Sequence, residues 1–214
     1  LGSREIASGC FESTRALFAQ RPAPDAIGID IPIGLTDCGP RDCDREARRV
    51  LGSPRASSVF PAPIRAVLDA RSWEEACAIR SRVEGKRMSK QAWAIVGKIR
   101  EVDEELRASA HLRECVREVH PEVSFREWSG APMRLRKTSR RGRAVRRRLV
   151  DEHFGPAAFE VVRARFRVRD VGHDDIVDAF AALWSAERIL RRVSRSLPER
   201  PPLDPCGLRT EIVY

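Results

Sequence analysis

The stretch that most constrains this fold is a short apolar run from Ala26 to Gly34, which reads AIGIDIPIG. β-Branched residues around a glycine, bounded by Gly and Pro, are typical of a buried strand in an α/β sheet. Pro32 has no amide hydrogen to donate, so we expect pairing to stop there and to leave Asp30 at the carboxyl end of the strand. Open α/β sheets bind their ligands beyond that end. Because an ionised carboxylate is costly there unless it is paired or holds a metal, Asp30 is either a site residue or a cap of the following turn.

Two further acidic segments resemble the first in their chemistry. Cys115–His120 is a predicted strand with Glu118 near its carboxyl end, and Pro121 breaks it. Asp175 and Asp178 are three residues apart near the start of a predicted helix, so they share a helix face. Acidic residues also stabilise a helix N-terminus, by roughly 0.3–1 kcal/mol each, and this alternative accounts for one or two aspartates but less well for three.

Together these carboxylates predict a catalytic metal site. Oxygen-only ligands suit Mg²⁺ or Mn²⁺, and two such ions about 4 Å apart can activate a water and stabilise the leaving oxygen in phosphodiester cleavage. We therefore expect catalytic roles for Asp30, Glu118, Asp175 and Asp178, with Asp30, Asp175 and Asp178 as the metal ligands. His120, between Glu118 and Glu122, is either a ligand or base, or a strand-end histidine with satisfied hydrogen bonds.

The net charge of +9 comes from one segment. Between Arg134 and Arg148 there are nine basic residues and no acidic one, so the rest of the chain balances at 31 basic against 31 acidic residues. Such a patch suits the phosphate backbone of DNA or RNA, which we expect as the partner. We expect Lys137, Arg140, Arg141 and Arg143 to bind it. The alternative is a solvated basic loop or helix face.

Composition excludes several protein classes. No run of 18 apolar residues is present and no secretory signal is visible, so we expect a cytoplasmic protein with no membrane partner. Neither GxxxxGK[ST] nor GxGxxG occurs, which argues against an NTPase or a dinucleotide enzyme. The six cysteines form no CxxC pair and are interpreted as reduced thiols. The length of 214 residues predicts one domain, residues 1–214, and leaves the oligomeric state open.

The remaining pattern predicts helices over 13–20, 42–51, 72–82, 89–106, 156–166 and 174–190, with edge strands over 4–9 and 210–214. In the helix over 89–106, an apolar stripe runs through Ile95, Ile99, Val102 and Leu106. Residues 134–148 are expected to be part loop and part helix. Ser57–Arg65 is predicted to be extended and irregular, because two prolines one residue apart exclude a helix.

Six segments, in order, resemble the bacterial and archaeal proteins of domain of unknown function 429, which are described as predicted RNase H-like nucleases. They are Ile27–Leu35 (IGIDIPIGL), Arg41–Arg48 (RDCDREAR), Ser57–Arg65 (SSVFPAPIR), Ser89–Trp93 (SKQAW), Glu118–Glu122 (EVHPE) and Asp174–Ala179 (DDIVDA). The resemblance implies an α/β fold with an RNase H-like mixed five-stranded sheet, helices on both faces, and a family-specific helical and irregular insertion.

The resemblance also implies roles for particular residues. Asp30 matches the fourth-strand carboxylate, and Asp175 and Asp178 match the closing-helix pair. Glu118 lies on what would be the fifth strand, where it binds a second metal or orients Lys137. Family members begin with a strand carrying a Gly-Val-Asp-Gly-like stretch, and nothing of this kind precedes Arg4. We therefore expect an N-terminally truncated chain without the first strand and its carboxylate.

The RDCDREAR and SSVFPAPIR segments have no counterpart in ordinary RNase H domains. They predict a family-specific pocket for a phosphate or nucleotide, built from Arg41, Asp44, Arg48 and Arg65. The alternative is an internal salt-bridge network that ties the irregular segment down.

Three functions follow. The first is a divalent-metal-dependent nuclease acting on DNA or RNA. The second is a non-catalytic nucleic-acid-binding or regulatory protein on a degenerate RNase H-like scaffold. The third is a small-nucleotide phosphohydrolase that uses the arginine pocket, and the lack of a glycine-rich phosphate loop weakens it.

Overall fold

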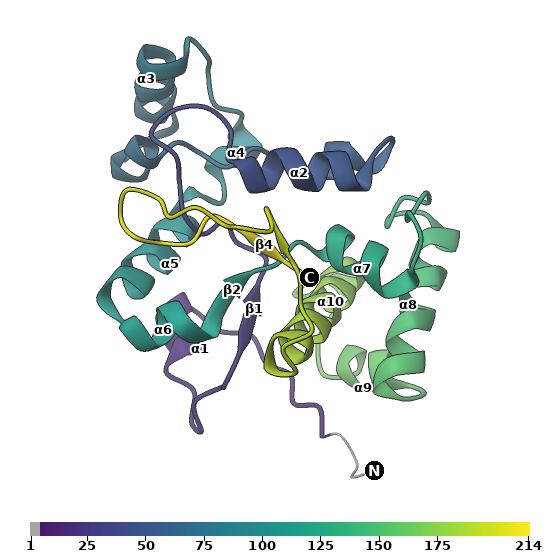
Figure 1. The fold of residues 1–214 in the computed structure, drawn as a ribbon. Coiled ribbons are helices and arrows are strands. Elements are labelled where there is room, and N and C mark those ends of the chain that lie inside the picture. Colours follow the sequence, from purple (N-terminus) through teal and green to yellow (C-terminus); the bar gives the residue numbers. More distant parts are fainter. Residues whose placement is uncertain (1–4) are drawn as a thin grey trace.

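The computed structural model describes residues 5–214 and has a mixed α/β architecture in which helices predominate (Figure 1). Its centre is a parallel pair of strands, β1 (Ile27–Ile29) and β2 (Val116–Glu118), in which Ile29 lies opposite Glu118. The two predicted strands are thus confirmed. Because the pair is parallel, Asp30 and the residues after Glu118 emerge at the same edge.

A second, antiparallel pair joins β3 (Ser196–Leu197) to β4 (Ile212–Val213). A single bridge between Val119 and Val213 brings β4 alongside the end of β2. The predicted strand over 210–214 is confirmed in this short form. The predicted strand over 4–9 is wrong for residues 5–9, which have no regular structure, and Arg4 lies outside the described residues.

Helices surround the central pair (Figure 1). Their bounds are α1 Thr14–Phe18, α2 Asp42–Leu51, α3 Trp73–Glu84, α4 Lys90–Trp93, α5 Val96–Ala108, α6 Ala110–Cys115, α7 Pro121–Ser129, α8 Arg140–Phe154, α9 Ala158–Arg163 and α10 His173–Leu190. Two 3₁₀ turns, Arg55–Ser58 and Arg65–Asp69, flank an extended Val59–Ile64. The predicted helices over 13–20, 42–51, 72–82, 156–166 and 174–190 are confirmed with small shifts at their ends.

Two helix predictions need correction. The single helix expected over 89–106 is two helices, because the chain leaves helical hydrogen bonding at Ala94 and Ile95. Val96, rather than Ile95, therefore joins Ile99 on the buried face. Helix α7 was not predicted at all, although Pro121 stands at its first position, where a proline lacks only an amide hydrogen that the helix would leave unpaired.

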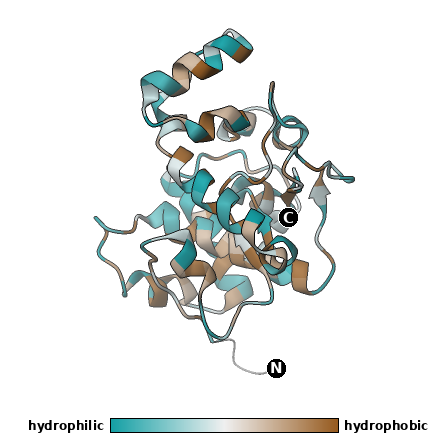
Figure 2. Ribbon diagram, turned by 90° about the vertical axis from the view of Figure 1, so that its left-hand side faces the viewer, coloured by the Kyte–Doolittle hydropathy of each residue, from teal (hydrophilic) through white to brown (hydrophobic). Residues whose placement is uncertain are grey.

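The buried apolar side chains fall into four clusters. One joins α7 to α10, a second joins α3 and α5 to the turn at Arg65–Asp69, a third lies between α1, α5 and β2, and the last joins α2 and α7 to β3 and β4. Figure 2 shows hydrophobic ribbon gathered in the middle of the molecule and hydrophilic ribbon on its outer loops. The packed helices therefore hold the short strands in place from several sides.

Helix α10 lies directly against β1. A Cβ atom built on Gly28 would be 2.7 Å from the carbonyl oxygen of Ala182, well inside van der Waals contact. Only glycine allows this approach. The same contact places the first turns of α10 beside the carboxyl end of β1, where Asp30 lies.

Among helices within residues 5–214, none has both the length and the apolar character needed to cross a membrane.

Candidate functional site

A cavity of about 280 Å³ opens at the carboxyl end of β1. Its walls come from separate parts of the chain, which bring together Asp30, Phe60, His120, Lys137 and Asp178. Two of the predicted metal ligands, Asp30 and Asp178, thus share one site although 148 residues separate them in sequence.

Asp30 is an acidic residue of this cavity whose carboxyl group has no protein partner within residues 5–214. It is solvent-accessible at the cavity mouth, and no residue within 5–214 gives it a hydrogen bond or an ion pair. Surrounding protein atoms raise its pKa to about 7, the neighbouring Asp178 carboxylate adds to this rise, and Lys137 opposes it. Near neutral pH, a cation placed beside Asp30 would therefore stabilise the ionised form of its carboxyl group.

Asp178 projects from the second turn of α10 and is paired. Its Oδ2 accepts a hydrogen bond from Lys137 Nζ at 2.6 Å. Burial raises the pKa of Asp178, and Lys137 opposes that rise. Lys137 stands in the loop before α8, and this loop is tightly fixed, since a Cβ on Gly142 would lie 1.9 Å from the carbonyl oxygen of Arg136. Of these two aspartates, Asp178 is therefore paired with the Lys137 ammonium, whereas Asp30 has no ion pair within residues 5–214.

His120 follows β2 and lies deep in the cavity wall. Its Nε2 is 3.4 Å from the carbonyl oxygen of Ser58, and its Nδ1 is buried without a hydrogen-bond partner among residues 5–214. Burial lowers the pKa of His120, so the imidazole is neutral at pH 7. The sequence left open a strand-end histidine with satisfied hydrogen bonds. His120 differs from that alternative because its Nδ1 atom makes no hydrogen bond within residues 5–214.

Asp175 does not reach this cavity. Its Oδ2 accepts a hydrogen bond from the backbone N–H of Gly172 at 2.8 Å, which caps the start of α10. Asp175 also lines a different, largely apolar cavity between α10 and residues 6–11. The helix-terminus alternative accounts for Asp175, because a helix leaves its first amide groups unpaired and an acidic side chain there satisfies one of them.

Glu118 and Arg41 form an internal ion pair. Arg41 Nη1 and Nη2 each donate to a Glu118 oxygen at 2.7 Å, and Arg41 Nη2 also donates to Asp44 Oδ1 at 2.6 Å. All three side chains are at most 6% exposed. Burial opposes the charge on Arg41, yet the Glu118 and Asp44 carboxylates raise the pKa of Arg41 well above its ordinary value. Glu118 therefore neither orients Lys137 nor offers a free ligand, because Arg41 occupies both of its oxygens.

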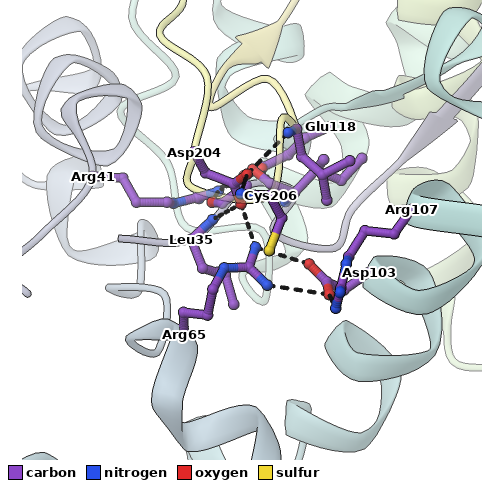
Figure 3. Close-up of polar contacts among 11 residues, drawn as sticks. Leu35, Arg41, Arg65, Asp103, Arg107, Glu118, Asp204 and Cys206 are labelled. Carbon is purple, nitrogen blue, oxygen red and sulfur yellow. Dashed lines mark hydrogen bonds and ion pairs between the residues drawn. The ribbon is translucent and has the colours of Figure 1, made fainter. Parts of the chain in front are cut away.

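Arg65 and Arg48 are also engaged inside the fold. Arg65 donates to both Asp103 oxygens, at 2.9 and 3.2 Å, and pairs with Asp204, as Figure 3 shows. Arg48 donates to the carbonyl oxygen of Val59 at 2.7 Å. The structure thus favours the internal network over the predicted phosphate pocket of Arg41, Arg48 and Arg65.

Asp204 is an important residue that the sequence analysis missed. Its oxygens accept hydrogen bonds from the backbone N–H groups of Leu35, Cys206 and Leu208 at 2.8–2.9 Å. The available signal was the Asp-Pro-Cys-Gly sequence at 204–207, which is typical of an aspartate that caps its own turn.

The basic segment divides into paired and unpaired residues. Arg146 is buried and donates to both oxygens of Glu122, while Arg147 and Arg148 pair with acidic residues on α8 and α9. Five other arginines are exposed and have no ion pair within residues 5–214; they are Arg134, Arg136, Arg140, Arg141 and Arg143. The predicted loop and helix over 134–148 are confirmed. Lys137, in the same loop as the unpaired Arg134 and Arg136, lines the cavity.

These residues fit one Mg²⁺ or Mn²⁺ ion. Mg²⁺ at phosphate sites takes one or two protein carboxylates and completes its shell with waters and substrate phosphates. The unpartnered carboxyl of Asp30 beside Asp178 meets this requirement. Across residues 5–214, no group of three or more His, Cys, Asp or Glu side chains is arranged to hold a metal ion.

Comparison with known proteins yields a family match. The family model described as "Protein of unknown function (DUF429)" matches residues 3–203. No curated protein and no solved structure matches the chain. The matched range includes Asp30, Phe60, His120, Lys137 and Asp178.

Proposed function

The chain belongs to the DUF429 family, and we propose that it binds nucleic acid and hydrolyses its phosphodiester bonds with one divalent cation. The observation that carries the proposal is the unpaired Asp30 carboxyl beside Asp178, in a cavity to which Lys137 and a row of free arginines lead. DNA and RNA share the phosphate chemistry that these groups would recognise.

Binding is the task of the basic segment. The exposed guanidinium groups of Arg140, Arg141 and Arg143 have no acidic partner within residues 5–214, so phosphates would not compete with internal ion pairs there. Lys137 lines the cavity and lies three residues before Arg140 in sequence, so it is the residue placed to donate to the phosphate nearest Asp30. Phosphate contacts of this kind position a nucleic acid without reading its sequence.

The chemical step would take place at Asp30 and Asp178. Both carboxylates would hold the cation, which would supply Lewis-acid polarisation of the phosphodiester and of a water molecule. Loss of the Asp30 proton near pH 7 prepares this ligand for binding. The apolar walls formed by Ile95 and Ile212 would limit the access of bulk water to the reacting phosphate.

A cleavage assay tests the proposal. Labelled DNA and RNA oligonucleotides are incubated with the protein in Mg²⁺ or Mn²⁺ and in EDTA, and the products are separated by length. We expect cation-dependent cleavage that Asp30→Asn and Asp178→Asn each reduce at least 100-fold, because losing even a group that only orients a metal ligand costs about 10- to 100-fold in activity. Asp175→Asn is the matched control and should retain activity, because Asp175 only caps α10. Equal cleavage by the wild type and Asp30→Asn would overturn the proposal.

A non-catalytic nucleic-acid-binding protein is the second candidate, and the Lys137–Asp178 ion pair favours it. Lys137 already neutralises one of the two carboxylates, as an internal cation would. Tight, salt-dependent binding without cleavage in either metal would select this function. The small-nucleotide phosphohydrolase has less support, since Arg41 and Arg65 are committed to internal carboxylates.

We also propose that the scaffold is RNase H-like. Three features support this proposal: the parallel pairing of β1 with β2, the acidic residue directly after β1, and a long closing helix with Asp178 packed against β1.

A further inference from the structure

The segment Ser57–Arg65 carries an exposed aromatic ring that the proposed chemistry does not use. Phe60 is 55% exposed, whereas its neighbour Val59 is 2% exposed. Phe60 lines the same cavity as Asp30 and Asp178. A ring left open to solvent inside a charged cavity gains free energy when an apolar or aromatic surface covers it.

The backbone around Phe60 is held in place from both sides. Arg48 donates to the Val59 carbonyl oxygen at 2.7 Å, and the Ala62 N–H donates to Asp44 Oδ2 at 3.3 Å. Pro61 and Pro63 follow Phe60 in sequence, and their rings fix the backbone φ angle at both positions. The exposure of Phe60 is therefore built into the fold, because buried Asp44 and the prolines fix the segment that carries it.

We propose that Phe60 stacks against an unpaired base of the nucleic acid whose phosphate lies at Asp30, Asp178 and Lys137. The substrate is then single-stranded DNA or RNA, or a single-stranded part of a longer molecule. This inference rests on the proposed function and adds the class of substrate. Stacking on an aromatic side chain accepts any base, so it fits a site whose other contacts are with phosphates.

The size of the cavity supports an unpaired nucleotide. At about 280 Å³ the cavity is slightly smaller than the volumes that hold small drug-like ligands, roughly 300–1,000 Å³. It can take a piece of one strand, whereas in a duplex the base faces its partner and is covered by its neighbours in the stack. A base that stacks on Phe60 must therefore leave, or never have had, a pairing partner.

Binding measurements with Ca²⁺ in place of Mg²⁺ test the inference, because the phosphate of the probe then meets a cation rather than two bare carboxylates. The probes are a fluorescent single-stranded oligonucleotide and the blunt duplex of the same sequence. Phe60→Ala should weaken single-strand binding about 5- to 150-fold, the range measured for losing one base–aromatic stack. Phe60→Trp should restore most of that affinity. The control is Phe11→Ala, since Phe11 is also exposed, at 44%, but lines the cavity beside residues 6–10.

Two further readouts separate stacking from other causes. Phe60→Ala should leave the salt dependence of binding unchanged, because it removes no phosphate contact. It should also leave duplex binding unchanged. Equal single-strand affinity in the wild type and Phe60→Ala, or equal losses for both probes, would overturn the inference. In that case Asp30-dependent cleavage, measured on the same proteins, would leave the proposed function standing, whereas failure to bind any nucleic acid would overturn both.

Discussion

Arg41 and Asp30 represent the two ways in which single charged residues behave in this protein. Most buried carboxylates are neutralised by an arginine inside the fold: Glu118 and Asp44 by Arg41, and Glu122 by Arg146. Asp30 has no such partner within residues 5–214. A buried ion pair contributes to the fold, while an unpaired carboxyl in a cavity is available for a ligand.

Replacement of Arg41 by alanine should destabilise the protein strongly. The substitution leaves Glu118 and Asp44 buried without a counter-charge, which costs about 3–5 kcal/mol. For a chain of this length the thermal midpoint should fall by roughly 2–4 °C per kcal/mol. Arg45→Ala, on the same helix with an exposed partner, is the control and should change stability by less than about 0.5 kcal/mol. A normally stable Arg41→Ala that loses only nucleotide affinity would instead support the predicted phosphate pocket.

The pKa of Asp30 makes a prediction about pH. Folding raises this pKa from 3.8 to about 7, so between these values the folded protein binds more protons than the unfolded chain and loses stability as the pH rises. Without divalent cations, Asp30→Asn should therefore melt at a higher temperature than the wild type at pH 8 and at a similar temperature near pH 3. The gain will be smaller than the full shift implies, because solvent reaches the carboxyl.

Added Mn²⁺ supplies the complementary measurement. At pH 8 it should raise the melting temperature of the wild type, since a ligand that binds only the folded state stabilises it, and it should not raise that of Asp30→Asn. Equal melting temperatures of the wild type and Asp30→Asn at pH 8 without metal would show that folding leaves the pKa of Asp30 at its ordinary value.

At the scale of elements, the loop before α8 and the first turn of that helix form one unit. Ser139 caps α8 by accepting a hydrogen bond from Gly142 N–H at 3.0 Å, and the same turn directs Lys137 into the cavity. The unpaired arginines lie within six residues of Lys137, on both sides of it in sequence. The unit thereby links a phosphate-binding surface to the two carboxylates.

Neutralising this unit should change the salt dependence of binding. Each phosphate contact contributes about −0.9 to the slope of log K against log salt for duplex DNA and about −0.7 for a single strand. Replacement of Arg140, Arg141 and Arg143 by glutamine removes up to three phosphate contacts and should therefore flatten the slope by about two to three units. The control replaces Arg71, Arg82 and Lys86 near α3, which removes the same charge elsewhere. Identical slopes for the two triple variants would support the alternative interpretation, in which the segment is a solvated loop or helix face.

Local patterns predicted most of these elements. The run ending at Asp30, the helix capped at Gly52 and the closing helix are encoded by apolar spacing and breakers close in sequence. The partners of Arg41 and Arg65 could not be predicted in this way. Glu118 and Asp204 lie 77 and 139 residues from them, and only the folded chain brings these charges together. Asp175 and Asp178 show the same limit, because helical spacing alone did not reveal which of the two faces the cavity.

At the scale of the whole molecule, the C-terminal segment closes the structure. After α10 the chain returns across the central strands, and Asp204 fastens it to Arg65 and to the backbone of Leu35 (Figure 3). The following residues form β4, whose Ile212 lines the cavity. Residues from opposite ends of the chain therefore support the same site.

Asp204→Ala should loosen this closure. The substitution removes the acceptor for three backbone N–H groups and leaves Arg65 with Asp103 alone, so we expect a loss of about 3–5 kcal/mol, as for a broken buried pair. Urea unfolding gives the loss, and faster hydrogen exchange of the Leu35, Cys206 and Leu208 amides locates it. Asp204→Asn, which keeps one acceptor oxygen, should lose less. Unchanged exchange at these amides would show that other contacts hold the segment.

The contact between Gly28 and Ala182 has a consequence for related sequences. It sets how near α10 can come to β1, and hence how far apart the carboxylates at positions 30 and 178 stand. Any side chain at position 28 would push the helix outwards and widen the gap that one small cation must bridge. Family members that keep both aspartates should therefore keep glycine two residues before the first. Members that have lost either aspartate are free to carry alanine, serine or a larger residue there, so this position can sort the family into chains with and without a cation site.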